Sequence, residues 1–83
     1  MCERGRSRFE VVADILEEAR GGKIKTHIVY GANLNNTIFG NYRDTLLGAG
    51  LLEERGRRYY TTEKGERFLE LMAKIREIIS LDD

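Results

Sequence analysis

The chain has 83 residues, of which 41% are hydrophobic and 34% charged, and its 14 basic residues balance its 14 acidic ones. A domain of this size buries only about 60–65% of its unfolded surface, so a partner chain would help to stabilise it. No apolar run approaches the ~18 residues that cross a membrane, and the N-terminus lacks the apolar core of a signal peptide. The single cysteine, Cys2, can form neither an internal disulfide nor a metal site by itself. We therefore expect a cytoplasmic protein with no membrane partner and no cofactor, and the zero net charge gives no argument for nucleic acid.

A basic arm precedes the first predicted helix. Residues 1–6 contain two arginines and a glycine, and Ser7 and Glu10 then have the spacing of a capping box. Gly21 and Gly22 are placed to end the helix. The apolar residues between these signals recur at three- and four-residue steps, which predicts a helix over residues 8–20. They are Phe9, Val12, Ala13, Ile15, Leu16 and Ala19.

A connector and a short second helix come next. Residues 23–25 predict an extended segment that can form an edge strand. Thr26 is placed to cap a helix over residues 27–32, with Ile28 and Val29 facing inward and Tyr30 packing on its ring. His27 is either a solvated residue of the first turn or a phosphate ligand at the helix N-terminus.

Residues 32–50 predict an amphipathic helix. Asn35 can cap it with its side-chain oxygen, and Gly50 can take the left-handed conformation that ends it, so the helix covers residues 36–49. Small polar groups on one face fit a major groove, but they equally suit an ordinary surface helix. The apolar face consists of Leu34, Ile38, Phe39, Tyr42, Thr45, Leu46 and Ala49, and the polar face of Asn36, Thr37, Gly40, Asn41 and Asp44.

A β-hairpin comes after this helix. Residues 51–55 and 59–61 have the composition of two strands, and Gly56 is placed at the turn between them. Three arginines, Arg55, Arg57 and Arg58, lie at the tip beside two tyrosines. The tip is either a phosphate-contacting wing or a solvated turn.

The last predicted helix carries more apolar residues than one small domain can cover. Thr62 is placed to cap a helix over residues 63–81, in which Phe68, Leu71, Ile75 and Ile78 recur at helical spacing. A patch of this kind usually marks an interface. The stripe spans only two heptads, so packing against the first helix is the alternative to dimerisation.

The order helix, connector, helix, helix, hairpin, helix is that of a winged helix. From Ser7 to Phe68 the chain resembles the archaeal winged-helix DNA-binding proteins of the "ten-a" class, which dimerise through a long C-terminal helix. The resemblance rests on residues 25–30 (KTHIVY), 32–34 (ANL), Tyr42 with Leu46, 50–52 (GLL) and 60–65 (YTTEKG). It implies an α+β, mostly helical fold: a winged helix-turn-helix of three helices and a two-stranded wing, with an extended C-terminal helix.

The resemblance also implies partners, a domain division and site residues. The partners are double-stranded DNA and a second copy of the chain, with no small-molecule ligand. Residues 1–6 form the arm, 7–62 the winged-helix domain and 63–83 the dimerisation helix. The implied DNA-binding residues are Thr26, His27, Asn35, Asn36, Thr37, Gly40, Asn41, Arg43, Arg55, Arg57 and Arg58, and the implied dimer interface consists of Phe68, Leu71, Met72, Ile75, Ile78 and Ile79.

This chain departs from the family pattern in the helix at 36–49. Gly40 and Gly48 stand where long polar residues are expected, and Arg43 where an apolar one is expected. Either the backbone approaches DNA closely at Gly40, or base contacts are weak and affinity comes from phosphates.

Two functions from different classes remain, and neither is enzymatic. The sequence has no paired-carboxylate motif, metal-ligand spacing, nucleophile with a base, or phosphate-cradling glycine loop. The first function is a homodimeric DNA-binding protein, either a transcription regulator or a nucleoid-associated protein, which the arginine tip and the resemblance favour. The alternative is a winged-helix protein interaction module without direct DNA binding, which the zero net charge and the lysine-free helix favour.

Overall fold

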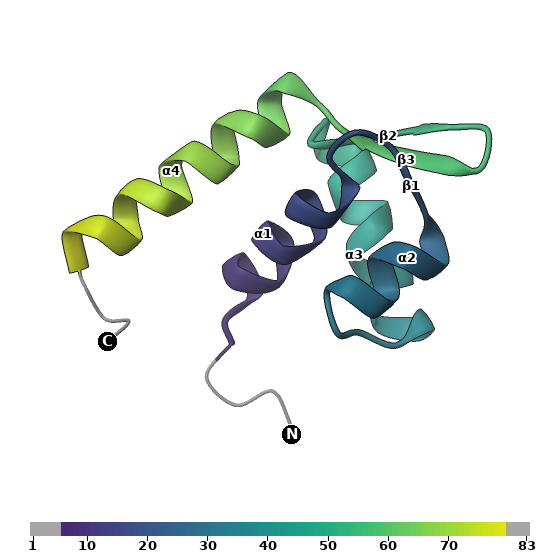
Figure 1. Ribbon diagram of the computed structural model, residues 1–83, viewed down its shortest axis with the longest axis horizontal. Coiled ribbons are helices and arrows are strands. Elements are labelled where there is room, and N and C mark those ends of the chain that lie inside the picture. The colour runs from purple at the N-terminus through teal and green to yellow at the C-terminus, as the bar shows by residue number, and fades with distance from the viewer. Residues whose placement is uncertain (1–5, 80–83) are drawn as a thin grey trace.

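Four helices and a small antiparallel sheet make up the part of the chain that the computed structural model describes, residues 6–79 (Figure 1). The predicted fold class, α+β and mostly helical, is confirmed, as is the order of the elements. In chain order these are α1 (Arg8–Ala19), β1 (Lys23–Ile24), α2 (Lys25–Gly31), α3 (Asn36–Ala49), β2 (Leu52–Arg55), β3 (Arg58–Thr61) and α4 (Glu63–Ile79). None of these helices is both long and apolar enough to traverse a lipid bilayer.

The capping box predicted for α1 is present. The Ser7 hydroxyl accepts a hydrogen bond from the Glu10 backbone N–H (3.2 Å), and the Glu10 carboxylate accepts one from the Ser7 N–H (2.9 Å). The helix ends at Ala19, one residue before the predicted end. Gly21 and Gly22 come next with φ angles of 82° and 93°, a conformation that glycine adopts without strain.

The wing contains three strands and not two, because β1 joins it. The strand order is β1-β3-β2, all antiparallel, with Lys23 opposite Tyr59 and Leu52 opposite Thr61. Lys23 and Ile24 of the predicted connector therefore form an edge strand, as the sequence suggested, whereas Lys25 is already the first residue of α2. Gly56, with a φ of 61°, makes the turn of the hairpin.

Two predictions about α2 are wrong. Thr26 does not cap the helix, because β1 runs directly into it and Ile24 occupies the cap position without a side-chain hydrogen bond. Tyr30 does not pack, because its side chain is 83% exposed. Ile28 is fully buried, and two residues along a helix correspond to about 200°, which turns Tyr30 away from the core.

The core lies where α1, α2, α3 and the sheet meet. Its largest fully buried side chains come from all three helices, and the ring of Tyr59 from β3 packs edge-on against Phe39 at 5.6 Å between centroids. Ile38, predicted on the apolar face of α3, is 40% exposed. The fully buried side chains are Ile15, Leu16, Ile28, Phe39 and Leu46.

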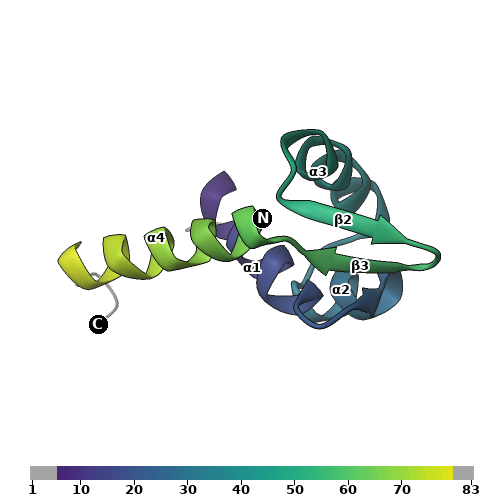
Figure 2. The same ribbon diagram turned by 90° about the horizontal axis from the view of Figure 1, so that it is seen from above.

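The helix α4 leaves the body of the domain from a tightly held start, which we call the α3–α4 junction (Figure 2). The Thr62 hydroxyl accepts from the Gly65 N–H (3.1 Å), as predicted for a cap, and donates to the Gly50 carbonyl (2.6 Å). Lys64 Nζ donates to the Ala49 carbonyl at the end of α3 (2.9 Å). A side chain at Gly65 would lie 2.5 Å from the Leu51 carbonyl oxygen, so only glycine fits there. Residues 80 and 81 of the predicted helix lie outside the described residues.

Candidate nucleic-acid interface

The helix α3 presents the polar face that its sequence predicts. Asn35 Oδ1 accepts from the Ile38 N–H (2.8 Å), and Gly50 ends the helix at a φ of 80°, so both predicted caps are present. Phe39 and Leu46 fix the inward side. The residues exposed on the other side are Thr37, Asn41, Asp44 and Gly48, and Asn36 is exposed in the first turn. Thr45 and Ala49, predicted on the apolar face, are exposed as well, because they lie about 120° and 80° around the helix from Phe39.

Arg43 lies at the edge of this face, on the side of the wing. Its side chain is 32% exposed, and its Nε donates to the Asp44 carboxylate at 3.1 Å. The phenol of Tyr59 and the carboxylate of Asp44 raise the pKa of the Arg43 guanidinium above its usual value. The structure thus ties Arg43 to β3 and balances its charge, and Asp44 places an acid on the exposed face of α3.

The two unexpected glycines of α3 have open space beside them. A side chain at Gly48 would meet nothing within 4 Å, and one at Gly40 would meet only the Arg43 guanidinium, at 4.0 Å. Packing within the domain therefore gives no reason for glycine at either position.

The three arginines of the wing tip differ in what holds them. Arg55 stacks on the Tyr60 ring at 4.5 Å, and its Nε donates to Glu53 (3.2 Å). Arg58 donates to the Gly22 carbonyl (3.2 Å) and so ties β3 to the turn after α1. Arg57, next to Gly56, is exposed and makes no ion pair within residues 6–79. Arg57 is therefore the arginine most available to an anionic ligand.

The helix α2 contributes two exposed side chains near its start, Thr26 and His27. His27 Nε2 lies 3.8 Å from a carboxylate oxygen of Glu18 on α1. The structure thus turns His27 toward α1 and leaves Thr26 free of described partners.

Arg6, which the sequence places in the basic arm, instead holds the turn between α2 and α3. Its Nη1 donates to Asp14 (2.8 Å) and to the Ala32 carbonyl (2.9 Å), and its Nη2 to the Asn33 carbonyl (3.2 Å). Asn33 has a φ of 59°, which is unusual for a residue other than glycine. Sequence reasoning missed this role, because the partners are distant in the chain and no local pattern links them.

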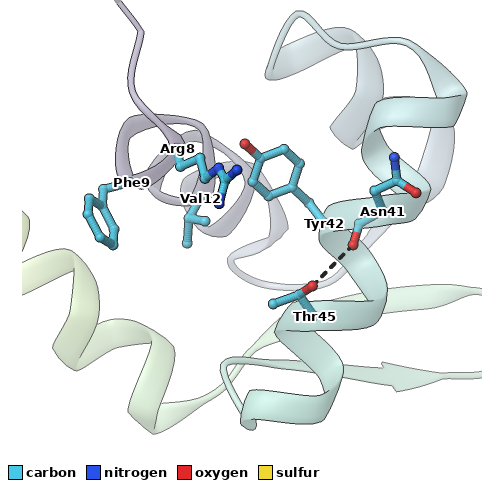
Figure 3. A pocket seen from close by; sticks show the side chains of 6 residues that line it. All are labelled: Arg8, Phe9, Val12, Asn41, Tyr42 and Thr45. Carbon is cyan, nitrogen blue, oxygen red and sulfur yellow. Dashed lines mark hydrogen bonds between the residues drawn. The ribbon is translucent and has the colours of Figure 1, made fainter.

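A hollow of about 430 Å³ separates α1 from α3 (Figure 3). Phe9 and Val12 of α1 line one side, and Tyr42 and Thr45 of α3 the other. Arg8 and Asn41 complete the lining of this α1–α3 hollow. Within residues 6–79, no three His, Cys, Asp or Glu residues are grouped closely enough to hold a metal ion.

Three helices and a wing, with an exposed polar face on the third helix, are the features of a winged helix-turn-helix protein. The chain belongs to the winged helix-turn-helix family, whose model matches residues 5–80. It is 34% identical over 76 residues to the uncharacterized protein MJ0287 of Methanocaldococcus jannaschii, a match that covers 90% of this chain and 78% of the relative. It also resembles the crystal structure of Sso10a-2, a DNA-binding protein from Sulfolobus solfataricus. The TM-score is 0.75 at 33% identity, over 90% of this chain and 86% of that one. The resemblance to archaeal winged-helix proteins is confirmed.

Proposed function

We propose that this protein binds double-stranded DNA, with α3 in the major groove and the wing tip against the backbone. The observation that carries the proposal is the exposed polar face of α3, together with the exposed Arg57 at the wing tip, on a winged helix-turn-helix domain. Sso10a-2, which shares the fold and a third of the sequence, is a DNA-binding protein, and this similarity supports the same partner here.

Different parts of this surface would make different contacts with the DNA. Asn36, Thr37 and Asn41 carry amides and a hydroxyl, which can pair with base edges. The phosphates are contacted by Arg55, Arg57 and Arg58. Arg57 makes the strongest of these contacts, because no residue within 6–79 forms an ion pair with it. Flanking positions on α2 and at the start of α3, namely Thr26, His27 and Asn35, contact the backbone, and Gly40 and Arg43 border the groove.

The second part of the proposal is that the protein acts as a homodimer through α4, with residues 7–62 as the DNA-binding unit. Leu71, Ile75 and Ile78 are 57%, 50% and 81% exposed, which is unusual for three aligned apolar side chains. Phe68, at the start of the same stripe, and Met72, beside it, are half-buried. Ile79 belongs to the same proposed interface, but its side chain lies outside the described residues. Such a dimer would act in the cytoplasm, as a transcription regulator or on the nucleoid.

The direct test is a titration of wild-type protein against random-sequence duplex at several salt concentrations. We expect log K to fall linearly with log salt, with a slope of about −0.9 for each phosphate contact. Absence of binding at about 50 mM salt, where phosphate contacts are strong, would refute DNA binding.

One observation favours a second candidate, a protein interaction module. Asp44 places a carboxylate on the exposed face of α3, and its side chain is 73% exposed although it pairs with Arg43. A carboxylate facing phosphates is unfavourable, so Asp44→Asn should strengthen binding to any DNA. If the protein binds no duplex and Asp44→Asn does not change that, the interaction module becomes the better proposal.

A further inference from the structure

Exposed large apolar side chains lie on several elements of the described chain, and four of them are on two helices, α1 and α4. Phe9, at the start of α1, is 66% exposed, and Leu71, Ile75 and Ile78 are exposed on α4. The two helices contact each other. Arg20, just after α1, forms two contacts of 2.9 and 3.1 Å with Glu66 of α4. Beyond this region α4 extends away from the body of the domain (Figure 2).

The α1–α3 hollow is open on the surface of the domain. Figure 3 shows Phe9 and Val12 on α1 and Tyr42 on α3, with the space between them unfilled. Arg8 lines the same hollow, and its long stem allows the guanidinium to remain in water when the apolar part is covered. The surface is therefore apolar at its floor and polar at its rim, as the centre and edge of a protein interface are.

The chain's own α4 is not free to cover this hollow. The α3–α4 junction sets its direction through the Thr62 and Lys64 hydrogen bonds to the end of α3, and Gly65 lies against the Leu51 carbonyl with no space for a side chain. The Arg20–Glu66 pair adds a further restraint on the first turn. Among residues 6–79, therefore, α4 does not cover the hollow.

The stripe on α4 is too small to hold two chains together by itself. Fully burying an aliphatic side chain removes about 60–120 Å² of apolar surface from water. Leu71, Ile75 and Ile78 are 57%, 50% and 81% exposed, so together they can supply only about 110–230 Å² per copy. A standard interface buries about 800 Å² per partner, of which about 500 Å² is apolar. Phe68 and Met72 are already partly covered by their own domain and add little.

We propose that α4 of a second copy of this chain packs on Phe9 and covers the α1–α3 hollow. This inference rests on the proposed homodimer and names the rest of its interface. By two-fold symmetry each copy gives one helix and receives another. Asn41, Tyr42 and Thr45 of α3 all line the hollow. The partner helix therefore packs beside the residue that we propose for base reading, and assembly and DNA recognition share one element.

The test compares Phe9→Asp with a control, Tyr30→Asp, by sedimentation equilibrium. Both residues are exposed, and an acid in the first turn of α1 favours the helix, so Phe9→Asp should fold. Each dimer loses two buried rings and gains two buried charges, so we expect the dimer dissociation constant to rise at least about 100-fold. Tyr30→Asp should leave it within about threefold of wild type, because Tyr30 on α2 is not part of the hollow.

A second measurement reports contact directly. Benzoylphenylalanine in place of Phe9, in a mixture of isotopically light and heavy chains, should cross-link to peptides of α4 from the other chain. Cross-links only within one chain, or equal dimerisation of Phe9→Asp and Tyr30→Asp, would overturn the proposal. If Ile75→Asp separates the chains and Phe9→Asp does not, the homodimer through α4 is supported, but the proposal that α4 of the second copy covers the hollow is refuted. A wild-type protein that is monomeric would refute both the homodimer and the covered hollow.

Discussion

At the scale of single residues, the wing tip shows how similar side chains acquire different tasks. Arg55 stacks on a tyrosine, Arg58 bonds the Gly22 carbonyl, and Arg57 is exposed beside the turn. An arginine that already bonds within its own domain has to break that bond or share its donors to bind phosphate, whereas Arg57 does not.

We therefore expect Arg57→Gln to flatten the slope of log K against log salt by about 0.9, the value for one lost phosphate contact. Fluorescence anisotropy between about 50 and 200 mM salt would measure it. Arg57→Lys should keep the slope, because the charge remains. Arg58→Gln should in addition lower the free energy of unfolding by about 1 kcal/mol, because it loses the hydrogen bond to the Gly22 carbonyl. An unchanged slope for Arg57→Gln would make the tip an ordinary solvated turn.

Asn41 and Arg43 should separate base reading from structural support. Asn41 is exposed on the polar face of α3, so Asn41→Ala should change the preference between DNA sequences by about 1–3 kcal/mol. Arg43→Ala should weaken binding to all DNA sequences alike and lower the free energy of unfolding by about 1 kcal/mol, because Arg43 interacts with Asp44 and Tyr59 of its own domain. Selection of preferred sites by each variant gives the comparison. A shift of preference for Arg43→Ala alone would reverse the two roles.

Arg6 offers a test of how the turn between α2 and α3 is held. Arg6→Ala removes three hydrogen bonds from a side chain that is 23% exposed, so we expect a loss of about 1–2 kcal/mol in stability. Faster amide hydrogen exchange at residues 33–36 should accompany it. Arg6→Lys should retain only part of the stability that Arg6→Ala loses, because a lysine lacks the planar guanidinium that bonds Asp14 and two carbonyls at once. Uniform exchange over the whole domain would show general loosening without a specific role at the turn.

At the scale of elements, α3 combines well-formed ends with two glycines in its interior. Neither Gly40 nor Gly48 has a packing neighbour that excludes a methyl group. Gly40→Ala and Gly48→Ala should each raise the free energy of unfolding by about 0.5–1 kcal/mol, as measured by urea denaturation. If the backbone at Gly40 touches DNA, Gly40→Ala should lose affinity while it gains stability. Equal or tighter binding by both variants would mean that no close backbone approach occurs in α3.

The sequence predicts those features of the fold whose causes are local. The Ser7–Glu10 box, the Asn35 cap and the Gly50 end lie within a few residues of the helix ends they stabilise, and all three are present. The failures have distant causes. Thr26 is not a cap, because β1 pairs with β3 and carries the chain straight into α2. For the site, spacing places Asn41 on the polar face, but the ties of Arg43 to Tyr59 and of Arg6 to the turn arise only when separate elements meet.

At the scale of the whole molecule, α4 is the element least supported by its own domain. Ile75→Asp places a charge at the centre of the proposed interface, which should cost several kcal/mol and separate the chains. Because Ile75 is half exposed in the single chain, the variant should still fold. Light scattering at tens of micromolar should give the mass of one chain for Ile75→Asp and of two for wild type. DNA affinity should fall with it, because a dimer holds two stretches of duplex at once.

Two results would contradict this prediction in different ways. A wild-type protein that is already monomeric at these concentrations would remove the dimer from the proposed function. A dimer that persists in Ile75→Asp would place the interface on another surface.

The α3–α4 junction also has a geometric consequence for a dimer of this kind. Since the junction joins the end of α3 to the start of α4 without slack, the length of α4 sets how far apart, and at what relative rotation, the two α3 helices lie. Recognition helices reach the same side of a duplex only when their separation is near a whole number of DNA turns, about 34 Å each. One residue inserted in α4 rotates the remainder of the helix by about 100° and advances it by about 1.5 Å. Changes in α4 length would therefore alter the phasing of the two half-sites, while every residue that touches DNA stays the same.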